Sequence, residues 1–119
     1  MESPQALVVL VTAAGDEEAE RIARALLDRR LIACANVIPH LHSLFRWNNQ
    51  LQQADESLLI MKTTPDALEE LTAVVKLHHS YEVPEIIALP VVGGSHGYLS
   101  WLSSEVRPPA DVNRTAKPD

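Results

Sequence analysis

The fold is decided by residues 33–63, which read ACANVIPHLHSLFRWNNQLQQADESLLIMKT. An Asn-Asn pair at 48–49 divides this stretch into two strand-like runs, and asparagine tolerates the positive φ that a two-residue hairpin turn requires. The sequence therefore predicts a strand over 33–47, a turn, and a return strand over 50–63. Pro39 lies within the first strand, where we expect a β-bulge or an edge position. Alternation along that strand predicts two opposite faces, formed by Leu41, Ser43, Phe45 and Trp47 and by His40, His42, Leu44 and Arg46.

The predicted hairpin is longer than the body of a compact chain of 119 residues. A strand of about fifteen residues spans roughly 50 Å, whereas a compact chain of this length has a diameter of roughly 35 Å. The tip should therefore project past the core with the side chains of Phe45 and Trp47, and exposed apolar groups on a projecting ribbon usually mark a contact surface. We predict that the hairpin packs on neighbouring copies of the chain. The alternative is a strand that breaks at Pro39 and folds back.

The flanking sequence supplies two further strands and three helices. An unbroken apolar run predicts a strand buried on both faces, and apolar residues at helical spacing predict amphipathic helices. The expected elements are a strand at 6–11, a helix at 16–30, a helix at 64–78, a strand at 86–91, and a short helix at 98–105 with Trp101 facing inward. The order β-α-β-β-α-β is that of a ferredoxin-like α+β sandwich, with one antiparallel sheet and two helices on a single face.

Length and composition bound the class of protein. A chain of 119 residues with 46% hydrophobic and 22% charged residues is a single globular domain, which we assign to residues 1–106, followed by a disordered polar tail at 107–119. The net charge of −6 works against nucleic-acid binding, and no apolar run approaches the roughly 20 residues of a membrane span. A single cysteine and the lack of a basic secretory segment favour a cytoplasmic location, with no nucleic-acid or membrane partner.

Histidines are the first candidates for metal ligands. His78 and His79 fall at a predicted helix end, and neutral imidazole binds Cu(II), Ni(II) and Zn(II). Adjacent helical residues point about 100° apart, so the two rings share an ion only where the helix has already ended. In the alternative, structural interpretation, His78 packs on the apolar stripe and His79 caps the last carbonyl groups. His40 and His42 form a second candidate pair, or else part of a solvated face.

Several polar residues are candidates for a cleft. They are Glu56, Lys62, Tyr81, Glu82 and Glu85. This set predicts either a ligand-binding cleft or an ion-pair network that closes a seam between subunits, and nothing in its spacing indicates a catalytic acid and base, so no enzymatic activity is expected. Cys34 has no second cysteine and no basic neighbour in the sequence, which favours a small buried residue over a reactive thiol.

Five segments, in the same order and at similar spacings, resemble the CutA family of divalent-cation tolerance proteins. They are LIACANVIP at 31–39, SLFRW at 43–47, MKTT at 61–64, YEVPEI at 81–86 and YLSWL at 98–102. The similarity extends from about residue 6 to residue 106. It implies a cytosolic homotrimer of ferredoxin-like subunits whose long hairpins wrap neighbouring subunits. It also implies a link to tolerance and binding of copper and other divalent metal ions, and no known reaction.

The resemblance also suggests metal ligands. The metal sites proposed for the family involve a histidine pair, matched here by His78 and His79, and in some members a cysteine on the first strand. This chain has Val11 at the cysteine position and Ser80 where the family commonly has proline. The first difference removes a thiolate that a tight Cu(I) site would use, and the second loosens the loop that would hold His79. With these differences, the resemblance implies a trimer that binds divalent metal weakly. The alternative is a metal-independent scaffold or signalling protein with an effector or partner protein in its inter-subunit clefts.

Overall fold

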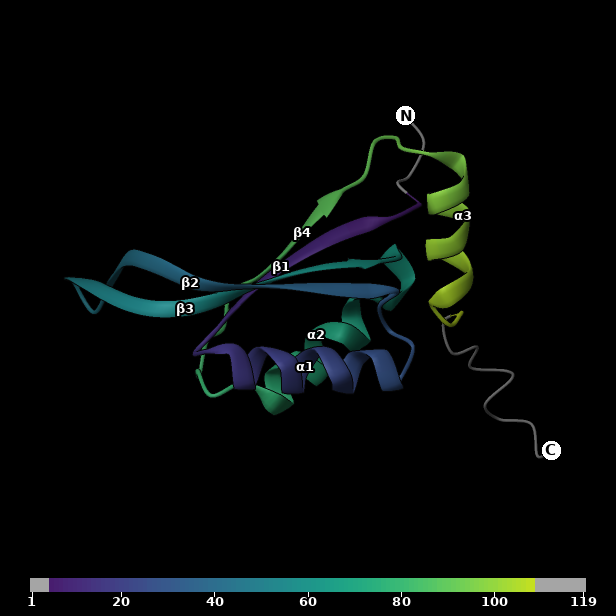
Figure 1. Cartoon of the computed structure of the whole chain (residues 1–119). Helices are drawn as coiled ribbons and strands as arrows, with labels where there is room; N and C mark the ends of the chain where they lie inside the picture. Colours follow the sequence, from purple (N-terminus) through teal and green to yellow (C-terminus); the bar gives the residue numbers. More distant parts are fainter. Residues whose placement is uncertain (1–4, 109–119) are drawn as a thin grey trace.

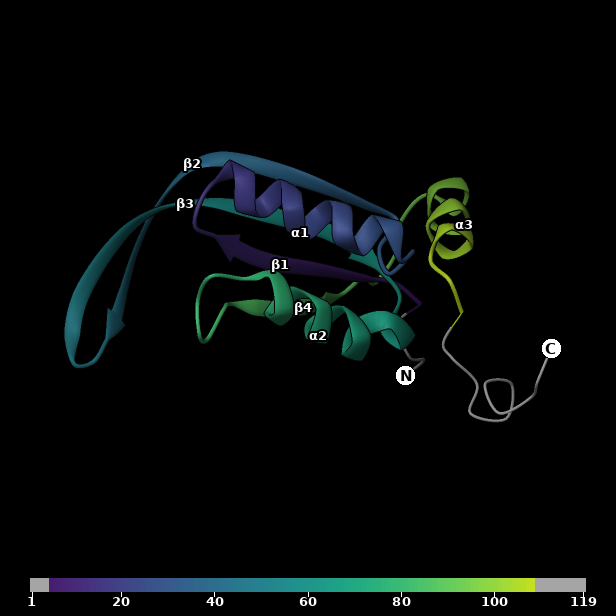
Figure 2. The ribbon, with the colours of Figure 1, turned by 90° about the horizontal axis from the view of Figure 1, so that it is seen from below.

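A computed structural model describes residues 5–108, and its centre is a four-stranded antiparallel sheet (Figure 1). The strands, in the spatial order β2-β3-β1-β4, are β1 (Leu7–Ala13), β2 (Cys34–Trp47), β3 (Gln50–Thr63) and β4 (Ile86–Pro90). The helices are α1 (Asp16–Asp28), the single turn η1 (Pro65–Ala67), α2 (Leu68–His78) and α3 (His96–Glu105). Helices α1 and α2 lie side by side on one face, and α3 lies at the end of the sheet away from the hairpin (Figure 2). The predicted α+β class and β-α-β-β-α-β order are confirmed.

The core lies between the sheet and the two helices α1 and α2. Alternate residues of β1 and β3 point toward the helices and are buried, whereas the residues between them are only half-buried. The fully buried side chains include Val9, Val11, Leu59 and Met61 from the sheet and Ile22, Leu26, Leu71 and Val75 from the helices. The predicted burial of the first strand on both faces is therefore wrong for the single subunit, because neither α1 nor α2 covers the second face.

A β-bulge in β2 changes which residues of that strand face away from the helices. The paired residues are Cys34 with Lys62, Ile38 with Leu58, and then Leu41 with Glu56 and Phe45 with Gln52. Pro39 and His40 together oppose a single residue of β3, and His40 has a φ of 61°. Side chains alternate along a strand, so even-numbered residues face the helix-free side before the bulge and odd-numbered residues face it afterwards. The predicted bulge is confirmed, and it places Phe45 and Trp47 on the helix-free side.

The hairpin projects beyond the core, as its length predicted (Figure 2). Within the described residues, 41–47 and 50–56 pair only with each other, and the longest dimension of the molecule is 50 Å. Asn48 and Asn49 form the turn with φ values of 52° and 62°, the positive values that a two-residue hairpin turn needs. The strand continues through the bulge, so it does not fold back at Pro39.

Helix α3 packs through its leucines and not through its tryptophan. Leu102 is buried, whereas Trp101 is 42% exposed and lies against the ring of Tyr98, with the ring centroids 5.4 Å apart. The predicted inward orientation of Trp101 is therefore wrong. Arg107, assigned from the sequence to the tail, donates to the backbone carbonyl of Arg29 and pairs with a carboxylate of α2. The rest of the predicted tail, residues 109–119, lies outside the described residues.

Candidate functional site

The imidazole of His79 lies buried where α2 ends. Its Nε2 is 2.7 Å from the carbonyl oxygen of Thr12 on β1, and its Nδ1 is 3.0 Å from the backbone nitrogen of Tyr81. A carbonyl oxygen only accepts and a backbone N–H only donates, so Nε2 carries the proton and Nδ1 accepts. The side chain is fully buried. Both ring nitrogens of the neutral imidazole thus already have protein partners.

Glu18, near the start of α1, is the acidic member of the same cluster. Its carboxylate accepts hydrogen bonds from the backbone N–H groups of Ala14, at 3.0 Å, and of Ser80, at 2.9 Å. Burial raises the pKa of Glu18, but these hydrogen bonds to the carboxylate outweigh it, and the pKa is lowered. Glu18 is one of three acids in the first turn of α1. In the structure it joins α1 to the loop after α2.

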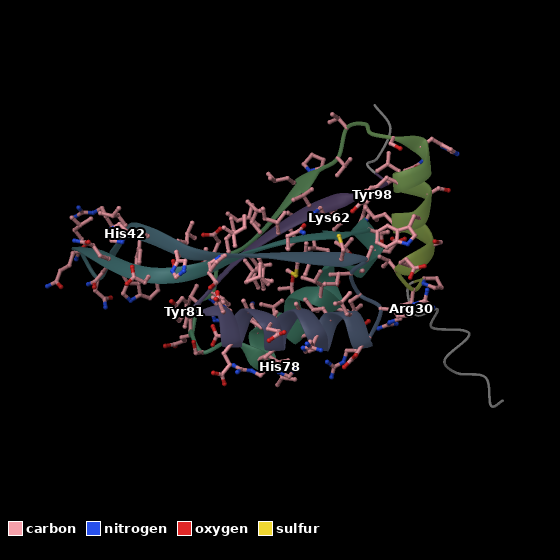
Figure 3. All side chains as sticks on the ribbon, in the orientation of Figure 1. Arg30, His42, Lys62, His78, Tyr81 and Tyr98 are labelled. Atoms are coloured by element: carbon pink, nitrogen blue, oxygen red, sulfur yellow. The ribbon has the colours of Figure 1, made fainter. Side chains whose placement is uncertain are left out.

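Tyr81 connects this cluster to the base of the hairpin (Figure 3). Its hydroxyl donates to the Oε2 atom of Glu56 over 2.9 Å, and its ring lies 4.8 Å from that of His79. Burial and the hydrogen bond to Glu56 raise the pKa of Tyr81 to about 12, so the phenol stays protonated at neutral pH. Glu56 is only 7% exposed and lies one residue beyond Ser57, the last partner of β1. The contact therefore braces the hairpin where it leaves the sheet.

The structure brings together only part of the predicted cleft. Glu56 and Tyr81 are in contact, but Lys62 lies six residues further along β3 and donates to the Oδ1 atom of Asn36 over 2.5 Å. Glu82 and Glu85 are exposed and form no ion pair within the described residues. Within a single chain these side chains therefore do not form one cleft.

The predicted metal ligands do not converge within the described part of the single chain. His79 has an extended backbone (φ −87°, ψ 141°), so α2 ends between the two histidines. His42 has its Nδ1 3.5 Å from the carboxylate of Asp55 on the exposed hairpin, and His40 lies at the bulge, where strand alternation is interrupted. Across residues 5–108, no three His, Cys, Asp or Glu side chains are grouped closely enough to hold a metal ion. An ion bound by His79 would have to displace the Thr12 carbonyl or the Tyr81 amide.

Cys34 has neighbours that the sequence did not reveal. Its Sγ lies 3.4 Å from the hydroxyl of Tyr98 on α3, and this contact raises the pKa of the tyrosine. On the sheet, Cys34 is the register partner of Lys62, a basic neighbour 28 positions away in the chain. The thiol is only half-buried. It therefore lies beside α3 and is not a core residue.

The fold of this chain, a four-stranded antiparallel sheet with two helices on one face and a projecting hairpin, is shared with known structures. The divalent cation tolerance protein CutA1 from Thermus thermophilus has a TM-score of 0.84 and 43% identity, over 86% of this chain and 99% of that one. CutA1 from Oryza sativa has a TM-score of 0.84 and 40% identity, over 88% and 96%. The sequence profile described as CutA1 divalent ion tolerance protein matches residues 7–105. The chain belongs to this family, which confirms the resemblance seen in the sequence.

The named relatives differ in length and location. The divalent-cation tolerance protein CutA of Thermus thermophilus is 46% identical over 95 residues, or 92% of its length, whereas this chain spans only 56% of the chloroplastic CutA of Arabidopsis thaliana, with 42% identity. A CutA structure from Archaeoglobus fulgidus is described as periplasmic. The family is named for tolerance of divalent ions and not for a reaction. Among the described residues, no helix is long and apolar enough to cross a membrane.

The lowered pKa of Glu18 predicts how stability depends on pH. Because the folded pKa lies below the ordinary value of 4.5, Glu18 stabilises the fold above that pH, and this stabilisation is lost as the pH falls through the folded pKa. Replacing Glu18 by Gln removes the carboxylate acceptor of one part-buried backbone N–H, and we expect a loss of about 1–2 kcal/mol at pH 7 that shrinks toward pH 3. Urea unfolding at fixed protein concentration measures it, with the exposed Glu17→Gln variant as control. An equal loss at both pH values would contradict the assignment.

Proposed function

We propose that the chain forms a homotrimeric divalent-cation tolerance protein of the cytoplasm, which binds copper or another divalent metal ion weakly and catalyses no reaction. The observation that carries the trimer is a surface on which large apolar side chains are exposed. It consists of the helix-free face of the sheet together with one side of the hairpin, and we call it the open face. Its apolar members are Val8, Leu10, Ile38, Leu58, Ile60, Ile87 and Leu89 on the sheet and Leu41, Phe45 and Trp47 on the hairpin.

The open face is unusually apolar for a surface in contact with water. Ile87 is 47% exposed, Phe45 42% and Trp47 50%, and contiguous apolar patches of this kind mark interaction sites. The hairpin extends the face beyond the subunit's own core, where only another chain is able to cover it. The outer edges of β2 and β4 are unpaired within the described residues and offer further contacts. The family resemblance supports three as the number of copies.

Two features support weak metal binding. Both ring nitrogens of His79 already have hydrogen-bond partners, and position 11 carries no cysteine thiolate. An ion that reaches the Nδ1 of His79 must first break its hydrogen bond from Tyr81, and this cost lowers the apparent affinity. Val11 supplies no ligand at the position where some family members have cysteine. His78 is half-buried, and neither of its ring nitrogens has a hydrogen bond within the described residues, so it is the more accessible ligand of the pair.

Sedimentation and thermal unfolding of the untagged protein test this function. We expect a particle of three 13.1 kDa chains and a melting temperature that rises with Cu(II), because a ligand of the native state stabilises it by mass action. The His78→Ala variant should remain trimeric and lose most of the Cu(II)-dependent rise. A folded monomer would refute the trimer. A trimer whose melting temperature does not change on addition of Cu(II), Ni(II) or Zn(II) would instead favour the metal-independent scaffold.

A further inference from the structure

Lys62 is a cation without a counter-ion on the open face. Its ammonium donates to the neutral amide oxygen of Asn36, and no carboxylate lies within 4.0 Å of it among the described residues. Its register partner on β1 is Val8, and the side chain is half-buried. Lys62 lies toward the α3 end of the face, near Tyr98 (Figure 3).

Glu56, at the hairpin end of the same face, is an acidic residue without a cationic partner among the described residues. The residue is 7% exposed, and the Tyr81 hydroxyl is its one hydrogen-bond donor within the described residues. An ionised carboxylate has room for about four such bonds. No cationic side chain lies within ion-pair distance of it in the described part of the chain.

The two charges do not meet within one subunit. Glu56 and Lys62 lie on the same strand and, by alternation, on the same face, and six residues of β-strand separate them by roughly 20 Å. A copy of the chain that covers the open face would remove the half-buried Lys62 from water and would complete the burial of Glu56. Burial of an unpaired charge is strongly unfavourable, so each group needs a partner that the covering copy supplies.

We propose that Lys62 of one copy pairs with Glu56 of the next, so that each subunit seam holds a composite site of Lys62 from one chain and Glu56 with Tyr81 from the other. This inference rests on the proposed homotrimer. In a ring, each contact joins two different surfaces of the chain, and each copy offers the cation at one end of the face and the anion at the other. Three equivalent pairs close the ring. These pairs determine the orientation and alignment of neighbouring chains in the ring more than they add to its total stability.

Charge reversal tests the pairing. Lys62→Glu and Glu56→Lys each place like charges at the seam, and we expect each to weaken association at least tenfold in a sedimentation dilution series. The double variant Lys62→Glu/Glu56→Lys restores opposite charges and should recover most of the association. Lys76→Glu, on the exposed side of α2, is the matched control and should stay trimeric. Far-UV circular dichroism shows whether each variant is folded. A Lys62→Glu variant that associates as tightly as the unaltered protein, or a folded double variant that associates no better than the single variants, would overturn the pairing.

A second measurement on the unaltered side chains covers the case in which Glu56→Lys fails to fold. A carbodiimide joins an amine and a carboxyl group directly, without a spacer, so it links Lys62 to Glu56 only where they touch. We expect covalently linked chains that contain this peptide pair, and their absence in Lys62→Arg, which keeps the charge and the trimer but cannot form the amide. A trimer without this crosslink refutes the pairing and leaves the proposed function intact. If the unaltered protein and the Lys62→Arg variant each form trimers only when phosphate is added, the residue at position 62 binds a small anion at the seam and does not pair with Glu56. A monomer refutes the trimer itself.

Discussion

Replacement of Phe45 by aspartate should dissociate the subunits, whereas the same replacement of its neighbour Leu44 should not. Phe45 lies on the open face, and Leu44 lies on the opposite side of the hairpin. Burial of a phenylalanine side chain contributes roughly 2–3 kcal/mol, and a buried carboxylate adds a further penalty. We therefore expect the Phe45→Asp variant to associate more than 100-fold more weakly than the unaltered protein.

Leu44 is a demanding control because it is the more exposed of the two residues, at 59% against 42%. If association resulted from non-specific hydrophobic contacts of the hairpin, the Leu44→Asp variant would show the larger effect. Sedimentation velocity over a dilution series distinguishes the two cases, with circular dichroism to confirm that both variants are folded. Dissociation of the Leu44 variant alone, or equal behaviour of both, would show that the open face is not the contact surface.

The sequence was most informative where the structure depends on local signals. The turn at 48–49 follows from two asparagines that accept positive φ, and the bulge follows from a proline that cannot donate to a neighbouring strand. Helix α3 shows the limit of such signals. Hydrophobicity favoured Trp101 as the inward residue, but packing against the end of the sheet selected Leu102.

The contacts of the candidate site depend on residues that are distant in the chain. His79 meets Thr12 and Glu18 only because β1 and α1 fold back beside the end of α2. The sequence indicated His79 as a candidate residue but did not indicate either of these partners. Register adds a second difficulty. Counting back from the turn pairs Lys62 with Ala35, and the bulge moves its true partner by one residue to Cys34. Expected neighbours on the sheet are therefore uncertain by one position wherever a bulge intervenes.

Replacement of His79 by alanine should destabilise the fold far more than replacement of the adjacent His78. The His79 ring is fully buried and satisfies the Thr12 carbonyl and the Tyr81 amide, so its removal leaves a cavity and two unpaired backbone groups. The Thr12 carbonyl, left unsatisfied in a part-buried position, costs about 1–3 kcal/mol, whereas the exposed Tyr81 amide is free to bond to water, and the cavity adds to the loss. We expect a loss of about 3 kcal/mol or more in the free energy of unfolding for His79→Ala, and less than about 1 kcal/mol for the half-buried His78.

Denaturant unfolding at fixed protein concentration measures this difference, and its outcome determines how any metal titration is interpreted. If His79 is the stabilising residue, the His79→Ala variant also releases Tyr81 from its amide contact and loosens the brace at Glu56, so a loss of metal binding in that variant would not identify a ligand. The His78→Ala variant keeps the brace, and a loss of Cu(II) binding there would identify one. Equal stability of the two alanine variants would mean that the His79 ring is free to leave its pocket, and His79 would then become the stronger candidate ligand.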